Sequence, residues 1–407
     1  MRAILIAVSA GLLLSSLAFS QETAVLAPKL LLTTQRLRRL ERDHTRQTVR
    51  WLNFENRVNT VPDSPERGFE LALYYAATHD VKRGREAVDW ALAHKCERRQ
   101  VALVSDWCAG LISADEKQAL ATTNCAIAII GRPPSASKLI RDSLFEAIAR
   151  GNDVSAAAAP GWKQVLTELQ DGKFADGQML YAACEYLTAI RATQHVDLRQ
   201  DDPQFFLGLP VELLLSLKPG QVQHPDWMTH IAALALIALD PNSESSQFLQ
   251  GWAIEDRQML REGAGVAYEL LWADPYLPGV GYQNLDPWTY DANGRLFARA
   301  SWNSDSCWIA ISSGAVQQEN CPAGWQNVSN PFGHMTLTPM SGRCTEVPRR
   351  KNNNDSVVLW RLQPRQKVIY FSQQRKEPVE ADAAGMWRLP QNVEGRVCIS
   401  LDKLKRP

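Results

Sequence analysis

The sequence lacks the short patterns that mark many familiar enzyme classes. It has no glycine-rich phosphate loop, no Gly-x-Ser-x-Gly elbow and no His-Glu-x-x-His, which disfavours nucleotide chemistry, serine hydrolysis of the α/β kind and zinc proteolysis. None of the eight cysteines is paired at CxxC spacing, so neither a zinc site nor a thiol redox site is expected. We therefore predict no metal and no cofactor.

An excess of one charge and long apolar runs within the chain are also missing. The 407 residues contain 44 Lys+Arg and 44 Asp+Glu, and basic residues do not interleave with aromatic ones, so no nucleic-acid partner is expected. After the N-terminal segment no stretch is long and apolar enough to cross a bilayer, which predicts no membrane span. No repeat of fixed length recurs, which disfavours a regular solenoid.

Residues 1–20 have the pattern of a secretory signal. Arg2 precedes an apolar run over residues 3–17, and Ala18 and Ser20 are the small residues that a signal peptidase reads. The pattern predicts a periplasmic or secreted protein, in which cysteines are free to form disulfides. Four cysteines precede residue 285 and four follow it, which favours pairing within each part; free buried thiols are the alternative for the first four.

The hydrophobic period changes from about 3.6 to 2 between residues 252 and 314. Before this stretch, apolar stripes such as Phe69, Ala72 and Leu73 predict ten to twelve helices in residues 30–272, joined mostly as antiparallel hairpins in an array or ring. Ser64-Pro65-Glu66 has the pattern of a helix start, with serine as the cap. Tryptophans are expected near helix starts in the pairs Asp106-Trp107, Gly161-Trp162, Asp226-Trp227 and Gly251-Trp252.

From Arg295 the pattern alternates, with Leu296 and Ala298 on one side and Phe297 and Arg299 on the other. Further strands are expected at residues 307–312, 333–339, 357–362, 367–371 and 396–401. Six or more antiparallel strands in about 120 residues fit a sandwich. The predicted fold is therefore a multidomain α and β chain: a signal peptide at 1–20, a helical domain at 21–285 and a small antiparallel β-sandwich at 286–407.

Several stretches resemble one known family. They are GRLFARASWNSDSCWIAISSG at residues 294–314, Val-Ser-Asp-Trp-Cys at 104–108, Asp171-Gly172 ahead of Tyr181, and Glu262-Gly263 ahead of Tyr268. Together with the order of domains, they resemble the heparinase II/III-like polysaccharide lyases. The resemblance implies an incomplete (α/α) toroid of helical hairpins, a β-sandwich, and β-elimination on a uronic acid in an acidic polysaccharide. In that reaction one group neutralises the carboxylate, a base removes a proton and an acid protonates the leaving oxygen.

The resemblance places Tyr181 where the family has a catalytic tyrosine, although a tyrosine beside an apolar stripe also packs as a structural residue. The chain has no Asn-His pair for carboxylate neutralisation, and residues 327–334 keep Gly333 but lose the family's histidines and aspartate before His334. His230 and Arg257 are the candidate substitutes in the helical part. The predicted catalytic set is thus Tyr181, His230, Arg257 and His334.

Aromatic residues form the predicted substrate-binding set, because the flat apolar face of a sugar stacks on an aromatic ring. Trp107, Trp227 and Trp252 are candidates for the floor of a ring, and Tyr276 and Tyr282 lie on the connector between the domains. The alternative for these tryptophans is that they plug the ends of a helical bundle.

Three functions remain open at this point. The first is a polysaccharide lyase, and the second is a non-catalytic glycan-binding or cell-envelope structural protein on the same fold. The third is an α/α-barrel glycoside hydrolase, which needs two carboxylates about 5 to 10 Å apart, such as Asp176 or Glu185 with Asp256.

Overall fold

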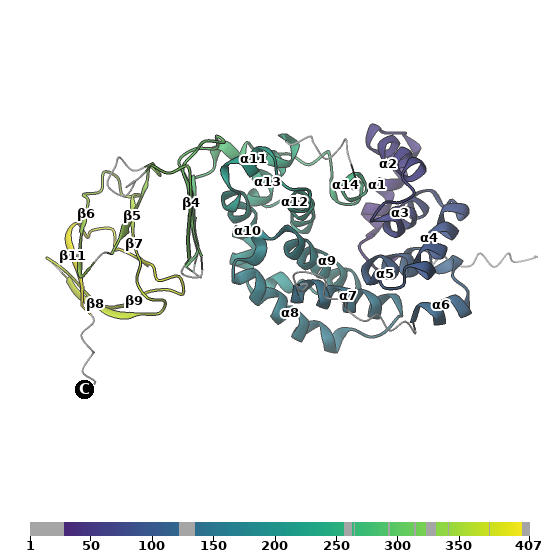
Figure 1. Ribbon diagram of the computed structural model, residues 1–407, viewed down its shortest axis with the longest axis horizontal. Helices are drawn as coiled ribbons and strands as arrows, with labels where there is room; N and C mark the ends of the chain where they lie inside the picture. Colours follow the sequence, from purple (N-terminus) through teal and green to yellow (C-terminus); the bar gives the residue numbers. More distant parts are fainter. Residues whose placement is uncertain are drawn as a thin grey trace, which may run out of the picture.

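The computed structural model shows a helical part followed by a β part, in the order that the sequence predicts (Figure 1). The residues it describes are 28–121, 135–255, 263, 265–291, 294–312, 315–322, 331–340, 342–373 and 375–400. The predicted signal at 1–20, Cys125, Asp256 and Arg257 lie outside these residues. None of the helices in the described ranges is long and apolar enough to cross a membrane.

Residues 34–272 contain fourteen α-helices within the described ranges, more than the ten to twelve predicted. Their bounds are α1 Thr34–Thr45, α2 Val49–Thr60, α3 Arg67–Thr78, α4 Val81–Ala93, α5 Arg98–Trp107, α6 Ala114–Ala121, α7 Ala136–Ala149, α8 Ser155–Gln170, α9 Gly177–Gln194, α10 Pro203–Ser216, α11 Pro219–Gln223, α12 Trp227–Leu239, α13 Glu244–Glu255 and α14 Gly265–Trp272. The described part of the chain also contains four 3-10 turns: η1 Ala109–Leu111, η2 Lys173–Ala175, η3 Leu198–Asp201 and η5 Tyr282–Asn284. Short elements such as α11 were missed because a helix of so few residues is too short to show a helical period in its apolar residues.

Seven helices, which we call the inner helices, pack one against the next along a continuous path. The path runs from α1 through α3, α5, α7, α9 and α12 to α14, and α14 in turn contacts both α1 and α2. The remaining long helices pack outside this path, with α4 on α3, α8 on α7 and α13 on α12. In Figure 1 the inner helices follow an arc, with α8 and α6 at its outer margin.

The start of α3 differs from its prediction. The stripe of Phe69, Ala72 and Leu73 is buried as expected, but the helix begins at Arg67 with no side-chain cap. Ser64 instead donates a hydrogen bond to the buried Glu70 carboxylate at 3.0 Å. A buried carboxylate is costly to leave without donors, which gives the serine a tertiary role in place of a local one.

Within the described ranges the β part contains eleven strands in three sheets. The strands are β1 Trp288–Tyr290, β2 Leu296–Arg299, β3 Trp308–Ser312, β4 Ala315–Glu319, β5 Met335–Pro339, β6 Cys344–Val347, β7 Ser356–Trp360, β8 Lys367–Ser372, β9 Arg375–Glu380, β10 Trp387–Arg388 and β11 Gly395–Ser400. Their order is β1-β2-β3-β4, β10-β7-β5 and β6-β11-β8-β9. All pairs are antiparallel as predicted, except that β5 and β7 are parallel.

Alternating side chains stack these sheets in layers. In β7, Val358 and Trp360 join a core with the first sheet, whereas Val357 and Leu359 join a second core with the third sheet. The β10-β7-β5 sheet therefore lies in the middle. A two-sheet sandwich was expected, and the three-layer order follows from β7 being apolar on both faces.

Strands β2 and β3 of the first sheet are also buried on both faces, because their other face packs on the helical part, whereas β4 is exposed. Leu296 and Ala298 belong to the core between the sheets, while Phe297 and Trp308 belong to the helical core. This confirms the alternation predicted for this strand. The Trp308 indole donates to the Leu215 carbonyl of α10 at 2.8 Å, which ties the sheet to that helix.

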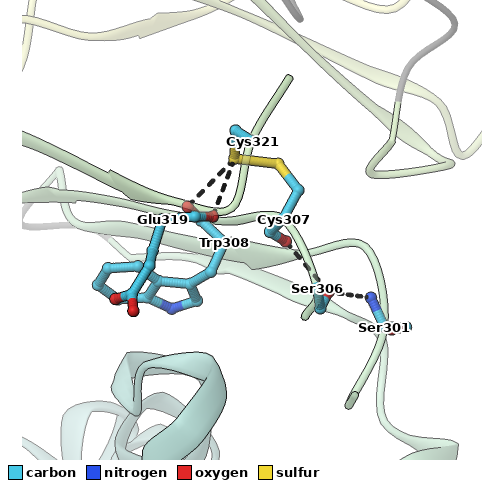
Figure 2. The surroundings of a disulfide bond; sticks show 6 residues. All are labelled: Ser301, Ser306, Cys307, Trp308, Glu319 and Cys321. Atoms are coloured by element: carbon cyan, nitrogen blue, oxygen red, sulfur yellow. Dashed lines mark hydrogen bonds between the residues drawn. A yellow bond between two sulfur atoms is a disulfide. The ribbon is translucent and has the colours of Figure 1, made fainter. Parts of the chain in front are cut away.

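The four cysteines of the β part pair with one another, as predicted for that part. The bonds are Cys307–Cys321 and Cys344–Cys398. In Figure 2 the first of these joins the residue before β3 to the end of the β4 hairpin, while Trp308 points toward the helical part. In the helical part Cys96 is disulfide-bonded, but Cys108 and Cys184 are free and buried, so the free-thiol alternative holds for these two.

Candidate functional site

The inner helices enclose a group of charged and hydroxyl side chains that we call the buried cluster: Arg99, Arg141, Tyr181 and Glu185. Glu185 is fully buried on α9. Arg99 of α5 binds its carboxylate through Nε at 2.9 and 3.1 Å and through Nη2 at 2.7 Å. Arg141 of α7 donates to Oε2 of the same carboxylate through Nη1 at 2.5 Å. One buried carboxylate thus joins three helices.

Tyr181 lies one turn before Glu185 and uses its whole hydrogen-bonding capacity inside the cluster. Its hydroxyl donates to Glu185 Oε1 at 2.6 Å and accepts from Arg99 Nη2 and from Trp272 Nε1, each at 3.1 Å. A phenol has one donor and two acceptor positions, so none is left for a substrate. The side chain is only 2% exposed.

The electrostatics of the cluster favour ionised Glu185 and neutral Tyr181. Burial raises the pKa of Glu185, but the charges of Arg99 and Arg141 outweigh it and hold that pKa below its ordinary value. Burial, followed by the charge of Glu185, raises the pKa of Tyr181 well above its ordinary value. Forming a tyrosinate base here is therefore unfavourable.

The cluster forms where the first turns of several inner helices meet. Arg99, Arg141 and Tyr181 of the cluster lie in the first two turns of α5, α7 and α9, whereas Glu185 lies in the third turn of α9. The neighbouring Arg36 and Tyr268 lie in the first two turns of α1 and α14. The partial positive charge of a helix N-terminus favours a carboxylate nearby. Close packing supports the arrangement, since a Cβ at Gly177 would lie 2.5 Å from the backbone nitrogen of Thr229 in α12.

Three residues connect the buried cluster to an exposed tryptophan and form what we call the rim: Glu66, the buried Tyr268 and the exposed Trp227. Glu66 binds Arg99 Nη1 at 3.1 Å and also hydrogen-bonds to Tyr268. Burial raises the pKa of Glu66 above its ordinary value, although Arg99 opposes the shift. The Trp227 ring lies 6.3 Å from that of Tyr268, and Trp227 is 48% exposed. The rim thus combines a carboxylate with a raised pKa and an accessible aromatic surface.

Neither of the two predicted catalytic histidines is joined to Tyr181. His230 is buried in α12, with its ring 5.7 Å from that of Trp252. His334 directly precedes β5 in the middle sheet, and its exposed side chain lies 3.6 Å from Asp355. Among the described residues, no hydrogen bond or ion pair connects any two of the three. Arg257 lies outside those residues.

The predicted sugar-binding aromatics divide into buried and exposed ones. Trp107 and Trp252 are buried, and their indoles donate to the carbonyls of Leu30 and Val222. Tyr282 is buried with its ring 4.9 Å from that of Trp302. Only Trp227 and Tyr276 of the set are exposed, Tyr276 by 69%.

Trp227 is also the only one of the four tryptophans expected at helix starts that begins a helix. Trp107 ends α5, Trp162 lies within α8, and Trp252 lies in the last turn of α13. The preceding Asp or Gly was taken as a helix start, but only Asp226 caps a helix in this way.

The carboxylates considered for glycoside hydrolysis have other roles. Asp176 caps α9, accepting from the backbone of Gln178 and Met179. Glu185 is held in the buried cluster, and Asp256 lies outside the described residues. No group of three His, Cys, Asp or Glu side chains placed to hold a metal occurs in the described ranges.

Arg99, Arg141 and Glu66 were missed as functional candidates. A signal existed in the sequence, because Arg99 precedes the buried Ala102 and Leu103 on one face of α5, and a charge at a core position needs a partner.

A scan against family models finds no match for this chain, and a search of curated proteins finds none either.

Proposed function

We propose that the protein is an exported glycan-binding protein that takes an acidic polysaccharide and does not cleave it with Tyr181. The observation that carries the proposal is the complete internal use of the Tyr181 hydroxyl, together with the exposure of Trp227 at the rim. The class of glycan comes from the resemblance to heparinase II/III-like lyases.

The proposal includes the finer architecture that this resemblance implies. The inner helices fit an (α/α) toroid, because their contacts lead from α1 to α14 and back to α1. The β part fits a sandwich extended by a third sheet. Export is supported by the predicted signal and by the disulfides, which persist in oxidising compartments.

The arginine of the buried cluster is engaged as fully as the tyrosine. Arg99 donates to Glu185, Tyr181, Glu66 and Tyr268. A lyase needs a cation that is free to neutralise the substrate carboxylate, and here Glu185 already occupies that position. Opening the cluster would leave buried charges without partners, which is strongly unfavourable.

A lyase is the second candidate, and the rim favours it. Burial raises the pKa of Glu66 above its ordinary value, a direction of shift that is common for catalytic carboxylic acids, and Glu66 hydrogen-bonds to Tyr268. In this version Glu66, rather than Tyr181, performs the acid and base chemistry, and Trp227 positions the sugar. Burial raises the pKa of Tyr268 well above its ordinary value, so Tyr268 stays neutral and acts only as a hydrogen-bond partner of Glu66.

One experiment separates the two candidates. The mature protein is tested on a glycan array and, in parallel, with polyuronates while the ultraviolet absorbance of an unsaturated product is followed. Binding without any rise in absorbance supports the glycan-binding protein. We expect Trp227→Ala to weaken that binding about tenfold. The control Leu207→Ala, which removes an exposed apolar side chain on α10, should leave it unchanged.

A rise in absorbance that Glu66→Gln abolishes would instead establish the rim lyase. A rise abolished by Tyr181→Phe but not by Glu66→Gln would contradict the structural role assigned to Tyr181. Absence of both binding and absorbance change across the panel would refute both candidates.

A further inference from the structure

The face of α1 that includes its first turn borders a pocket that the buried cluster and the rim do not use. The pocket measures about 460 Å³ and is lined by Thr34, Gln35, Arg38, Arg39 and Arg42. The last four are spaced at i, i+3, i+4 and i+7, which places them on one face of the helix. Three guanidinium groups therefore border one cavity, which we call the α1 pocket.

The positive charge of the α1 pocket is only partly compensated. Arg38 and Arg42 are exposed, and neither forms an ion pair with any residue in the described part of the chain. Arg39 is buried, with Nη1 3.4 Å from Asp274 and Nη2 bonded to the Leu271 carbonyl, while its Nε has no hydrogen-bond partner. After the Asp274 pairing, two positive charges remain.

The local helix adds to this imbalance. Arg38 and Arg42 are spaced at i and i+4, where like charges repel and destabilise a helix. The first turn of α1 contains no acidic residue, so the positive end of its dipole is not countered there. An anion in the pocket would relieve both effects.

An aromatic surface lies beside the charges. The Arg42 guanidinium is 5.7 Å from the centre of the Tyr276 ring, and that ring is largely exposed. An accessible tyrosine next to arginines provides a flat apolar face and a charge at once, which suits a sugar bearing an anionic group.

We propose that the α1 pocket is a binding site for an anionic group, a carboxylate or a sulfate, carried on a saccharide that packs against Tyr276. This site deepens the proposed function and rests on it. Arg38 and Arg42 bind the anionic group, and Arg39, fixed by Asp274, holds the pocket's base in position.

The test uses the full mature chain with three labelled polymers: polygalacturonate, which carries carboxylates, dextran sulfate, which carries sulfates, and neutral dextran. Binding is measured for the wild type, Arg38→Gln, Arg42→Gln and the control Arg46→Gln. Arg46 is an exposed arginine that ends the same helix but does not line the pocket, so its loss removes the same charge elsewhere. Circular dichroism verifies that each variant is folded.

We expect binding to at least one charged polymer and not to dextran. Loss of either pocket arginine should raise Kd about tenfold, against less than about threefold for Arg46→Gln, and binding should weaken with added salt. The polymer that responds identifies the anionic group. Equal effects of all three substitutions would overturn the α1 pocket while leaving the proposed function intact. Failure of the wild type to bind either charged polymer would overturn both.

Discussion

Replacing Glu185 by glutamine tests whether the buried cluster stabilises the helical part. The substitution keeps the shape of the side chain but removes the negative charge that Arg99 and Arg141 share. It also places amide hydrogens against guanidinium hydrogens. Removing one partner of a buried ion pair typically costs about 3–5 kcal/mol, because the remaining charge is left uncompensated.

Two contacts limit the loss, since Arg99 keeps Glu66 and Arg141 keeps Asp142. We therefore expect Glu185→Gln to lower the free energy of unfolding by about 3 kcal/mol, the lower end of that range. The measurement is urea unfolding followed by far-ultraviolet circular dichroism, which reports on the helices. The matched control is Glu146→Gln, which removes a partly exposed partner of Arg98 and should cost no more than about 1 kcal/mol.

The pH dependence gives an independent check. The pKa of Glu185 is held below its ordinary value, so the folded state binds its proton less tightly than the unfolded state. The stability that Glu185 contributes is present above about pH 4.3, the unfolded pKa, and is lost as pH falls through the lower folded pKa. The variant should lack this loss. A change in unfolding free energy for Glu185→Gln equal to that of Glu146→Gln would refute the reasoning.

Two further predictions concern the contacts between helices and connector and between helices and sheet. Burial raises the pKa of Glu212 to about 7, although the charge of Arg295 opposes the shift. The free energy of unfolding should therefore fall on the order of 1–3 kcal/mol as pH rises from about 4 to 7. In urea unfolding, Glu212→Gln should flatten that part of the pH profile. An added Cβ at Gly251 would lie 1.9 Å from the Val280 carbonyl oxygen. Gly251→Ala should therefore lower the midpoint of thermal unfolding by several degrees, which corresponds to a loss of about 1–3 kcal/mol in the free energy of unfolding. The control Gly110→Ala, whose added Cβ meets no atom, should not lower the midpoint.

The order of helices and strands was predictable because it depends on local hydrophobic period. The alternation at residues 296–299 also assigned the side chains to the correct faces of the strand, since Leu296 and Phe297 are buried in different cores. The parallel pairing of β5 with β7 was not predictable. Parallel strands need a crossover connection, and the hydrophobic period does not show how the chain between β5 and β7 runs. The third sheet also depends on a non-local pairing, that of β6 with β11.

The site was predicted only in part, for a physical reason. The resemblance made Tyr181 a candidate, but whether its hydroxyl is available depends on Glu185, Arg99 and Trp272, two of which come from distant helices. Sequence spacing identifies residues on one helix face and gives no information on whether their hydrogen bonds are already made. The same limit applies to Trp107 and Trp252, whose burial against other helices removed them from the candidate surface.

The predicted domain boundary at residue 285 does not coincide with a boundary of the hydrophobic core of the helical part. Phe297, Trp308 and Ala310 lie beyond that boundary but are buried in the helical core, and Arg295 bonds Glu212 on α10. A helical part ending at 285 would therefore expose the α10 surface that these side chains cover and would leave the raised-pKa carboxylate of Glu212 without its arginine. Because apolar burial is the main favourable term in folding, the first sheet stabilises the helical part as well as the β part. The two parts thus share one structural element, and the β part completes the packing of the helical part that contains the rim and the α1 pocket.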